Sequence, residues 1–193
     1  MIVPLPAAGA TDGIQLTEAS TLTIENSLIA NLPAYGVFAT AGSVRIVDSI
    51  IRGNGSYAVS LADGARGVVS GTKVTDNAYG IVAVGQAEGT GTSLVVKDCL
   101  VAGGVTGVAV LTTAAAAVRA AVTRTTIEAT FYAVASQTLG AGTAILALSD
   151  SSVSNNQTAW FQQGAGSEIR FAGKNLFTEN GSSTGSLTPV LLQ

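Results

Sequence analysis

Histidine is absent from this 193-residue chain, cysteine occurs once, and charged residues make up only 11% of it. Without histidine, the chain lacks the side chain that most often serves as a general acid or base near neutral pH and as a metal ligand. The single cysteine, Cys99, excludes an internal disulfide framework. A net charge of −3 offers no basic footprint for nucleic acid. We therefore expect no nucleic-acid partner, no metal site and no cofactor.

Aromatic residues are also scarce, at 5%, and there are only four prolines. Hydrophobic residues nevertheless reach 47%, which argues against disorder and requires a core built from Val, Ile, Leu and Ala. The scarcity of Lys and Glu argues against a helical bundle, whose exposed faces are rich in both. No apolar run reaches the ~18 residues of a membrane span. The start at Met1 has neither the basic residues nor the apolar core of a secretion signal.

An internal repeat organises the chain. A small residue followed by an apolar one recurs at spacings of 23, 22, 22, 27, 26 and 26 residues. Each such pair begins a new repeat unit, and we call it a restart. The residue before the restart is Tyr in four units (Tyr35, Tyr57, Tyr79 and Tyr132) and Thr in two others (Thr106 and Thr158). The restarts are Gly13-Ile14, Gly36-Val37, Ala58-Val59, Gly80-Ile81, Gly107-Val108, Ala133-Val134 and Ala159-Trp160.

Within each unit, apolar residues alternate with polar ones, which is the pattern of a strand with one buried face. Stacking the units aligns similar side chains into columns, so that neighbouring units bury together what one unit alone cannot. One inward column is Ile29, Ile51, Val74, Val101, Ile127, Val153 and Phe177. A second is Val37, Val59, Ile81, Val108, Val134 and Trp160. A column of small residues is Ser27, Ser49, Thr72, Cys99, Thr125 and Ser151, in which we expect Cys99 to be a buried spacer.

Asparagine or glycine recurs in the turn after the first inward column. Both residues enter the left-handed backbone region at low cost, and stacked Asn side chains can hydrogen-bond along a column. We therefore expect left-handed turns and an amide ladder here. The residues are Asn54, Asn77, Gly104, Asn156 and Asn180, of which Asn54, Asn156 and Asn180 also match the short glycosylation pattern.

Units of 22 to 27 residues suit three short strands and three turns. The six-residue period of left-handed hexapeptide helices, the Gly-Gly-x-Gly-x-Asp run of calcium-binding repeats and the frame of leucine-rich repeats are all absent. The sequence predicts an all-β right-handed parallel β-helix of about seven coils with three parallel sheets. We expect a single domain over residues 1–183 and a capping tail over 184–193, with Leu187, Val190 and Leu191 on the last coil.

The units over residues 13–183 resemble those of the pectate-lyase-like right-handed β-helix superfamily. The segments Gly13–Ser27 and Phe171–Gly181 are most similar to the C-terminal half of bacterial right-handed parallel β-helix repeat proteins. That resemblance implies a secreted or cell-surface protein, although the signal and further coils of longer members are not present here. It brings no known activity.

The best candidate for chemistry is Asp98, Arg124 and Asp150 on consecutive coils, with Lys97 and Arg45 on the same general face. Characterised lyases of the superfamily hold calcium with clustered carboxylates and use Arg or Lys as a base, whereas hydrolases pair Asp residues. Coils ~4.8 Å apart would bring these groups within reach of an ion-pair ladder or a weak cation site. We interpret them as a solvated edge column and name no catalytic residue.

Two aromatic residues are candidates for ligand contact. Phe38 and Phe161 follow inward positions by one residue and should therefore point outward, whereas Trp160 should belong to the core. Outward Thr pairs do not recur in every coil, which disfavours an ice-binding array.

The interpretation that fits best is a non-catalytic structural or interaction module of adhesion type, with a polysaccharide or another surface protein as partner. The alternative is a carbohydrate-binding or polysaccharide-degrading member of the same superfamily. Open coil ends expose unpaired strand edges, and Pro4 and Pro6 only partly blunt the first one. We therefore expect self-association through the N-terminal coil end.

Overall fold

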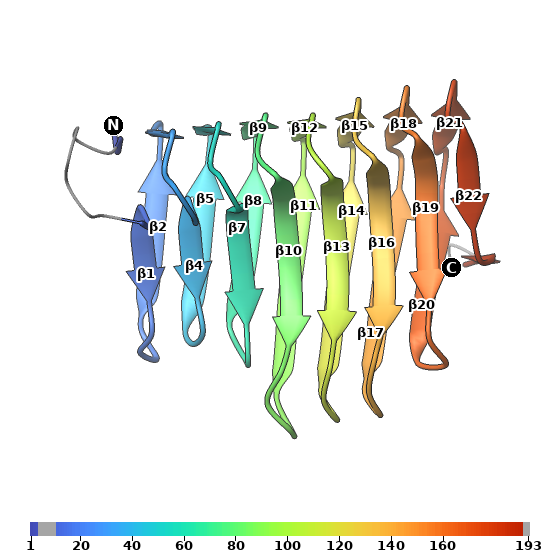
Figure 1. The fold of residues 1–193 in the computed structure, drawn as a ribbon, viewed down its shortest axis with the longest axis horizontal. Helices are drawn as coiled ribbons and strands as arrows, with labels where there is room; N and C mark the ends of the chain where they lie inside the picture. Colours follow the sequence, from blue (N-terminus) through green and yellow to red (C-terminus); the bar gives the residue numbers. More distant parts are fainter. Residues whose placement is uncertain (4–10, 191–193) are drawn as a thin grey trace.

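The computed structural model describes residues 1–3 and 11–190, which form a rod of stacked coils with the two ends of the chain at opposite ends of the rod (Figure 1). No helix occurs in these residues. Each coil contributes one strand to each of three sheets, and strands of successive coils pair in parallel. The prediction of an all-β parallel solenoid of about seven coils with three sheets is confirmed.

The first sheet carries the strands that open each coil. Its strands are β1 (Ile14–Leu16), β4 (Val37–Ala39), β7 (Tyr57–Ala62), β10 (Tyr79–Gly85), β13 (Thr106–Thr112), β16 (Tyr132–Thr138), β19 (Thr158–Gln163) and β22 (Ser182–Thr184). In Figure 1 the coils of β10, β13 and β16 extend beyond the others at their lower turns, in keeping with their longer strands.

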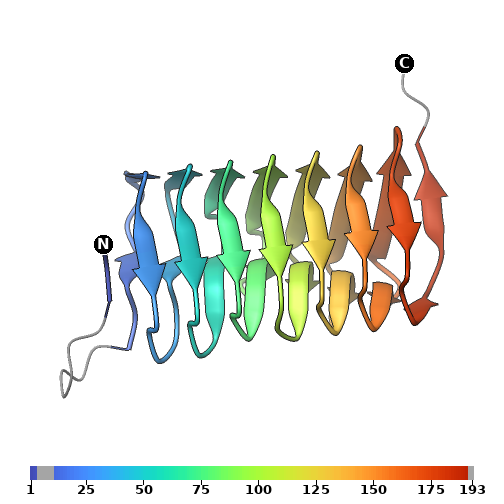
Figure 2. The same ribbon diagram turned by 90° about the horizontal axis from the view of Figure 1, so that it is seen from above.

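The second and third sheets complete the coil, as the view from above shows (Figure 2). The second sheet contains β2 (Thr21–Glu25), β5 (Ser43–Val47), β8 (Arg66–Ser70), β11 (Gly91–Lys97), β14 (Ala117–Thr123), β17 (Thr143–Ser149), β20 (Ser167–Ala172) and β23 (Leu187–Pro189). The third sheet contains β3 (Leu28–Ala30), β6 (Ile50–Arg52), β9 (Lys73–Thr75), β12 (Leu100–Ala102), β15 (Thr126–Glu128), β18 (Ser152–Ser154) and β21 (Leu176–Thr178).

Both predicted inward columns exist, residue for residue. Ile51 pairs with Ile29 on one side and Val74 on the other, and the column continues through Val101 and Ile127. Their side chains are almost completely buried in one continuous apolar core. Burying each such Val or Ile contributes about 1.5–3 kcal/mol before conformational entropy is subtracted. The stacked columns are therefore what holds the coils together.

Trp160 closes the second inward column, next to Val134. It is only partly buried, packs against the core and meets the ring of Phe177 edge-on at 5.4 Å. Its indole N–H donates to the Gly185 carbonyl at 3.2 Å. Trp160 packs against the core as predicted, and it covers the C-terminal end of the core.

The small-residue column forms a hydrogen-bonded ladder at the turn between the second and third sheets. The Ser27 N–H donates to the Ser49 hydroxyl at 3.1 Å, and the Ser49 N–H donates to the Thr72 hydroxyl at 3.3 Å. Cys99 takes the next place, with 5% of its surface exposed and its thiol directed at the Lys97 carbonyl. Burial raises the pKa of this thiol, so it stays protonated and unreactive. The prediction of a buried spacer is confirmed.

The amide ladder also exists, but its residues are not the left-handed ones. The Asn54 amide donates to Asn77 Oδ1 at 2.8 Å, and the Asn156 amide donates to Asn180 Oδ1 at 2.9 Å. Gly104, which separates the two halves, has the predicted positive φ. For the four Asn residues the predicted left-handed backbone is wrong, because in each of these turns the residue just before the Asn takes the positive φ. Those residues are Gly53, Asp76, Asn155 and Glu179.

The asparagine side chains point inward, where their amides satisfy buried backbone groups. Asn54 and Asn156 are 2% and 3% exposed, which leaves no room for a glycan at either residue. At these two positions the asparagine serves the amide ladder, although the sequence matches the glycosylation pattern.

The chain beyond residue 184 continues the spiral. Strand β23 pairs with β20, and Leu187 packs against the core. The Val190 N–H donates to the Phe171 carbonyl at 2.9 Å. Leu191, Pro4 and Pro6 lie outside the described residues, and the division into a domain of 1–183 and a tail of 184–193 stays a prediction.

Candidate functional site

Asp98 and Arg124 form an exposed ion pair where the second sheet turns into the third. Arg124 donates from Nε to Asp98 Oδ1 at 2.7 Å and from Nη2 to Oδ2 at 2.9 Å. This hydrogen bonding lowers the pKa of the Asp98 carboxyl and raises that of the Arg124 guanidinium. The side chains remain 46% and 58% exposed, respectively. A carboxylate held ionised in this way is a poor proton donor, and its partner a poor base.

Asp150 does not hydrogen-bond to this pair. Its Oδ1 accepts the backbone N–H of Lys174 at 3.1 Å, one coil further along. Arg45 pairs instead with Glu25 at 3.2 Å. Asp98, Arg124 and Asp150 share one more property, because all three have positive φ values between 46° and 55°. These residues therefore hold left-handed turn positions, with polar side chains directed to solvent.

The outer face of the first sheet carries a different cluster, built from tyrosines. Tyr35, Tyr57 and Tyr79 stack on successive coils, with ring centroids 5.2 and 4.8 Å apart. Burial raises the pKa of the Tyr57 phenol, and the neighbouring Tyr35 and Tyr79 add to the rise. We call this column, together with Tyr132 further along, the tyrosine ladder. Tyrosine combines an apolar ring with a hydroxyl that stays hydrated, so a row of such rings forms an amphipathic surface.

Phe38 and Phe161 lie beside the ladder on the same face. Phe38 stacks on Tyr35 and Phe161 packs at a tilt on Tyr132, each with centroids 4.8 Å apart. Both rings are half-buried and pack against a small outer apolar cluster that includes Val82. They point outward as predicted but are partly covered by their tyrosine neighbours. A ligand contact at either ring stays a prediction.

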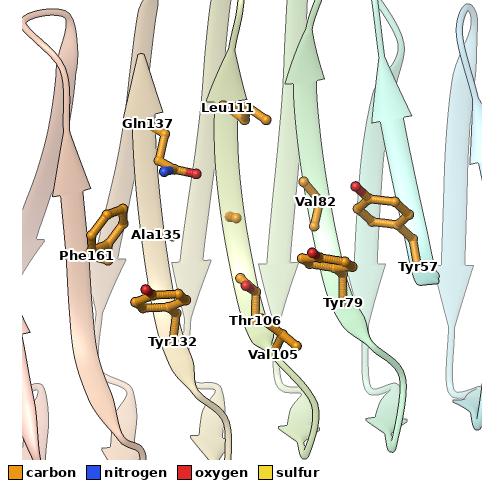
Figure 3. A pocket seen from close by; sticks show the side chains of 11 residues that line it. Tyr57, Tyr79, Val82, Val105, Thr106, Leu111, Tyr132, Ala135, Gln137 and Phe161 are labelled. Atoms are coloured by element: carbon orange, nitrogen blue, oxygen red, sulfur yellow. The ribbon is translucent and has the colours of Figure 1, made fainter. Parts of the chain in front are cut away.

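A hollow of about 230 Å³ lies in this face. Figure 3 shows Tyr79 and Tyr132 along one edge with Thr106 between them, Leu111 and Gln137 toward the other edge, and Phe161 at one end. A second hollow of about 120 Å³ shares Tyr57 and Leu111 with the first. The first hollow is lined by Tyr57, Tyr79, Val82, Val105, Thr106, Ala109, Leu111, Tyr132, Ala135, Gln137 and Phe161.

The strands that form the face around the hollows carry no charged residue. None of the strands of the first sheet contains Asp, Glu, Lys or Arg. The second sheet, by contrast, carries residues such as Arg66, Arg119 and Glu168. Ligand sites are typically apolar hollows with a few polar groups that orient the ligand. The first sheet thus offers an apolar, uncharged surface with hydroxyl and amide groups at its margins.

Sequence reasoning missed this surface, although its signal was visible. A Tyr precedes four of the restarts, and Thr106 stands where a Tyr would continue the series. Because those tyrosines occupy equivalent places in successive coils, they had to stack in any parallel solenoid. Leu111 and Gln137 carried no comparable pattern, and only the structure brings them to the hollow.

Among the described residues, no helix is long and apolar enough to cross a membrane.

Neither a curated protein nor a solved structure matches the chain. The family described as "Right handed beta helix region" matches residues 7–157, which is most of the chain. The three parallel sheets of this chain, wound in one spiral, agree with that description. The chain therefore belongs to the right-handed β-helix family.

Proposed function

We propose that this β-helix is a non-catalytic interaction module, secreted or at the cell surface, that binds an extended polysaccharide along the outer face of its first sheet. The observation that carries the proposal is the pair of neighbouring hollows along the tyrosine ladder. Sugar rings present apolar C–H faces and polar edges. Aromatic rings with hydroxyl and amide groups beside them complement both.

The arrangement of the ladder suits a polymer better than a compact ligand. Tyr35, Tyr57 and Tyr79 follow the rod axis one coil at a time, and the two hollows share Tyr57 and Leu111. Coils repeat every ~4.8 Å, so the surface offers similar contacts at regular intervals. A chain molecule with its own repeat can use several such contacts at once.

Polysaccharide cleavage has less support. The Asp98–Arg124 pair lies at the turn between the second and third sheets, whereas the hollows lie on the first sheet. No charged side chain lines either hollow. General acid–base catalysis needs a titratable group within hydrogen-bond reach of the scissile bond.

The test is binding to a panel of insoluble neutral and acidic polysaccharides, with soluble products assayed in the same samples. We expect retention on at least one polysaccharide and no release of sugar. Tyr132→Ala removes a ring that lines the hollow and should weaken binding about 3- to 10-fold, in line with the energy of one aromatic contact. Val95→Ala is the matched control, because Val95 is exposed on the second sheet and its loss should leave binding unchanged.

Two results would contradict the proposal. One is the absence of binding to every polysaccharide. The other is binding that Tyr132→Ala and Val95→Ala affect equally. Release of sugar, abolished by Asp98→Ala, would establish the degradative alternative instead.

Self-association through the N-terminal coil end is part of the same proposal. Within the described residues, β1 and β2 each pair on one side only. Ile2 covers part of the neighbouring β3 edge, where its N–H donates to the Leu28 carbonyl at 2.7 Å. An unpaired edge is a template for another strand. We expect light scattering to show a mass that grows with concentration, and a constant monomer mass would contradict this.

A further inference from the structure

Between Tyr35 and Tyr132 the tyrosine ladder lacks one ring, and the larger of the two hollows lies at that position. Tyr57 pairs in register with Tyr79, Tyr79 with Thr106, and Thr106 with Tyr132. Thr106 thus occupies the place of a tyrosine, and it is almost fully buried. The chain fills this rung of the ladder with a methyl and a hydroxyl group where its neighbours supply a six-membered ring.

The space left by that ring is open to a ligand. Tyr79, Thr106 and Tyr132 all line the larger hollow, and Figure 3 shows the threonine side chain between the two rings. Two coils separate Tyr79 from Tyr132, which corresponds to about 9.6 Å. A ring placed midway would lie about 4.8 Å from each tyrosine, similar to the observed Tyr57–Tyr79 spacing of 4.8 Å.

The size of the hollow favours a single ring. Its volume of about 230 Å³ is below the range of about 300–1,000 Å³ that is typical for sites of drug-sized ligands. The floor beside Thr106 consists of small or β-branched side chains, Val82, Ala109 and Ala135. Gln137 faces the same space and donates from its amide to Gln163 Oε1 at 3.0 Å, which holds the amide in a fixed place.

The absence of charged side chains from the lining of the hollow favours a neutral sugar ring over an acidic one. The carboxylate of a uronic acid would lose water on entering the hollow and would find no Lys or Arg in its lining. Burying an unpaired charge is strongly unfavourable. A neutral pyranose brings only hydroxyl groups, which the tyrosine phenols and the Gln137 amide can partner.

We propose that the gap at Thr106 is a subsite for one uncharged pyranose residue, which completes the tyrosine ladder between Tyr79 and Tyr132. This inference rests on the proposed polysaccharide binding and adds the position and the chemical class of the sugar. It requires a sugar ring in the gap at Thr106, whereas the proposed function requires only that a polysaccharide bind along the tyrosine ladder and its hollows.

The test fills the gap. Thr106→Tyr places the missing ring in its rung and should weaken the binding of neutral oligosaccharides at least about tenfold. The matched control is Thr158→Tyr, since Thr158 takes the same place two coils further along, next to Tyr132, but does not line the hollow. It should bind like the wild type.

The ligands are the hexasaccharides of glucose, mannose and xylose, compared with hexagalacturonate by calorimetry on the full chain. We expect at least one neutral hexasaccharide to bind at least about tenfold more tightly than hexagalacturonate. Far-UV circular dichroism of each variant verifies that the β-helix is intact. We expect the fold to accept Thr106→Tyr, because the new ring would lie between two tyrosines, as Tyr57 does.

The possible failures can be told apart. Wild-type affinity in Thr106→Tyr, together with a loss in Tyr132→Ala, would overturn the subsite and leave the proposed function standing. Binding of hexagalacturonate as tight as that of the neutral sugars would overturn the chemical class. Absence of binding to any polysaccharide would overturn the proposed function and the subsite together.

Discussion

Residues in the left-handed backbone region form the turns between the sheets. Each turn from the third sheet to the first contains a residue with a positive φ between 54° and 76°, and the turn at Gly103 has a second such residue, Gly104, with a φ of 85°. Asn, Asp and Gly adopt this backbone region at the lowest cost, because other side chains bring Cβ too close to the carbonyl. The residues in this column are Asn31, Gly53, Asp76, Gly103, Ala129, Asn155 and Glu179. Ala129 and Glu179 are thus the strained members.

Ala129→Gly should stabilise the protein. Ala129 has a φ of 54° and is exposed, so glycine relieves the strain without removing a buried contact. The relief of about 1–2 kcal/mol exceeds the entropy that glycine adds to the unfolded chain, about 0.4–1 kcal/mol. We expect a net gain of about 0.5–1 kcal/mol in urea unfolding. Ala102→Gly, in strand β12, is the control and should destabilise. A loss of stability in Ala129→Gly would show that the turn is not strained.

At the scale of the element, side-chain hydrogen bonds join the equivalent turns of successive coils. Asn77 Oδ1 accepts from the Asn54 N–H at 3.0 Å and from the Asn54 amide at 2.8 Å. Its own amide donates to the carbonyls of Ile51 and Thr75 at 3.2 and 2.9 Å. One side chain therefore satisfies groups on two coils, and all of this happens in a residue that is 2% exposed.

Asn77→Ala should destabilise the protein by about 2–4 kcal/mol, because it leaves several buried donors and acceptors without partners. Denaturant unfolding followed by circular dichroism measures this loss. Lys73→Ala on the neighbouring strand β9 removes an exposed side chain and is the control, with little expected change. Equal stability in Asn77→Ala and Lys73→Ala would mean that water replaces the amide ladder.

The tyrosine ladder should make stability depend on alkaline pH. The pKa of Tyr57 is raised in the folded state by burial and by Tyr35 and Tyr79. The stability that the neutral phenol contributes is therefore complete below the ordinary tyrosine pKa of about 10 and is lost as the pH rises through the raised value. Free energies of unfolding measured from about pH 9 upward should fall. Tyr57→Phe keeps the stack and should flatten the decline, and an unchanged slope would contradict the assignment.

The sequence was most informative where each coil repeats the same chemistry. The column through Ile51, Val74 and Val101 was predictable because a β-branched residue returns at the same place in every unit except the last, which has Phe177. The turn backbone was less predictable, since Asn54 is held by its side-chain hydrogen bonds while the preceding Gly53 bends the chain. Both Asn and Gly satisfy the simple rule for left-handed turns. Composition alone could not say which of the two residues takes the turn.

The candidate site was least predictable because it depends on a tyrosine that is absent from one coil. The ring missing at Thr106 has meaning only after the register places Thr106 between Tyr79 and Tyr132. The apolar floor at Ala109 and Ala135 looks in sequence like any other strand position. The charged residues Asp98 and Arg124 are conspicuous in sequence, yet they form an exposed ion pair at a turn, away from the hollows.

At the scale of the whole molecule, each coil contacts chiefly its two neighbours, so the rod should tolerate the loss of one coil. Deleting residues 80–106 joins Tyr79 to Gly107 and restores the Tyr-Gly step that Gly80 provided. The register of β10 with β13 means that β7 then meets the remainder of β13. The shortened chain should keep its β circular dichroism and a cooperative, lower-temperature unfolding transition.

The same deletion should abolish the binding of neutral sugars, because it removes Thr106 and sets Tyr79 directly beside Tyr132. Deleting residues 36–57 is the matched control. It joins Tyr35 to Ala58, so that Tyr35 takes the place of Tyr57 while the gap at Thr106 remains. Calorimetry should show binding in the second deletion and none in the first, with both folded. If both deletions bound sugar equally, the gap would not be the site, whereas unfolding of both would show that stability depends on more than neighbouring coils.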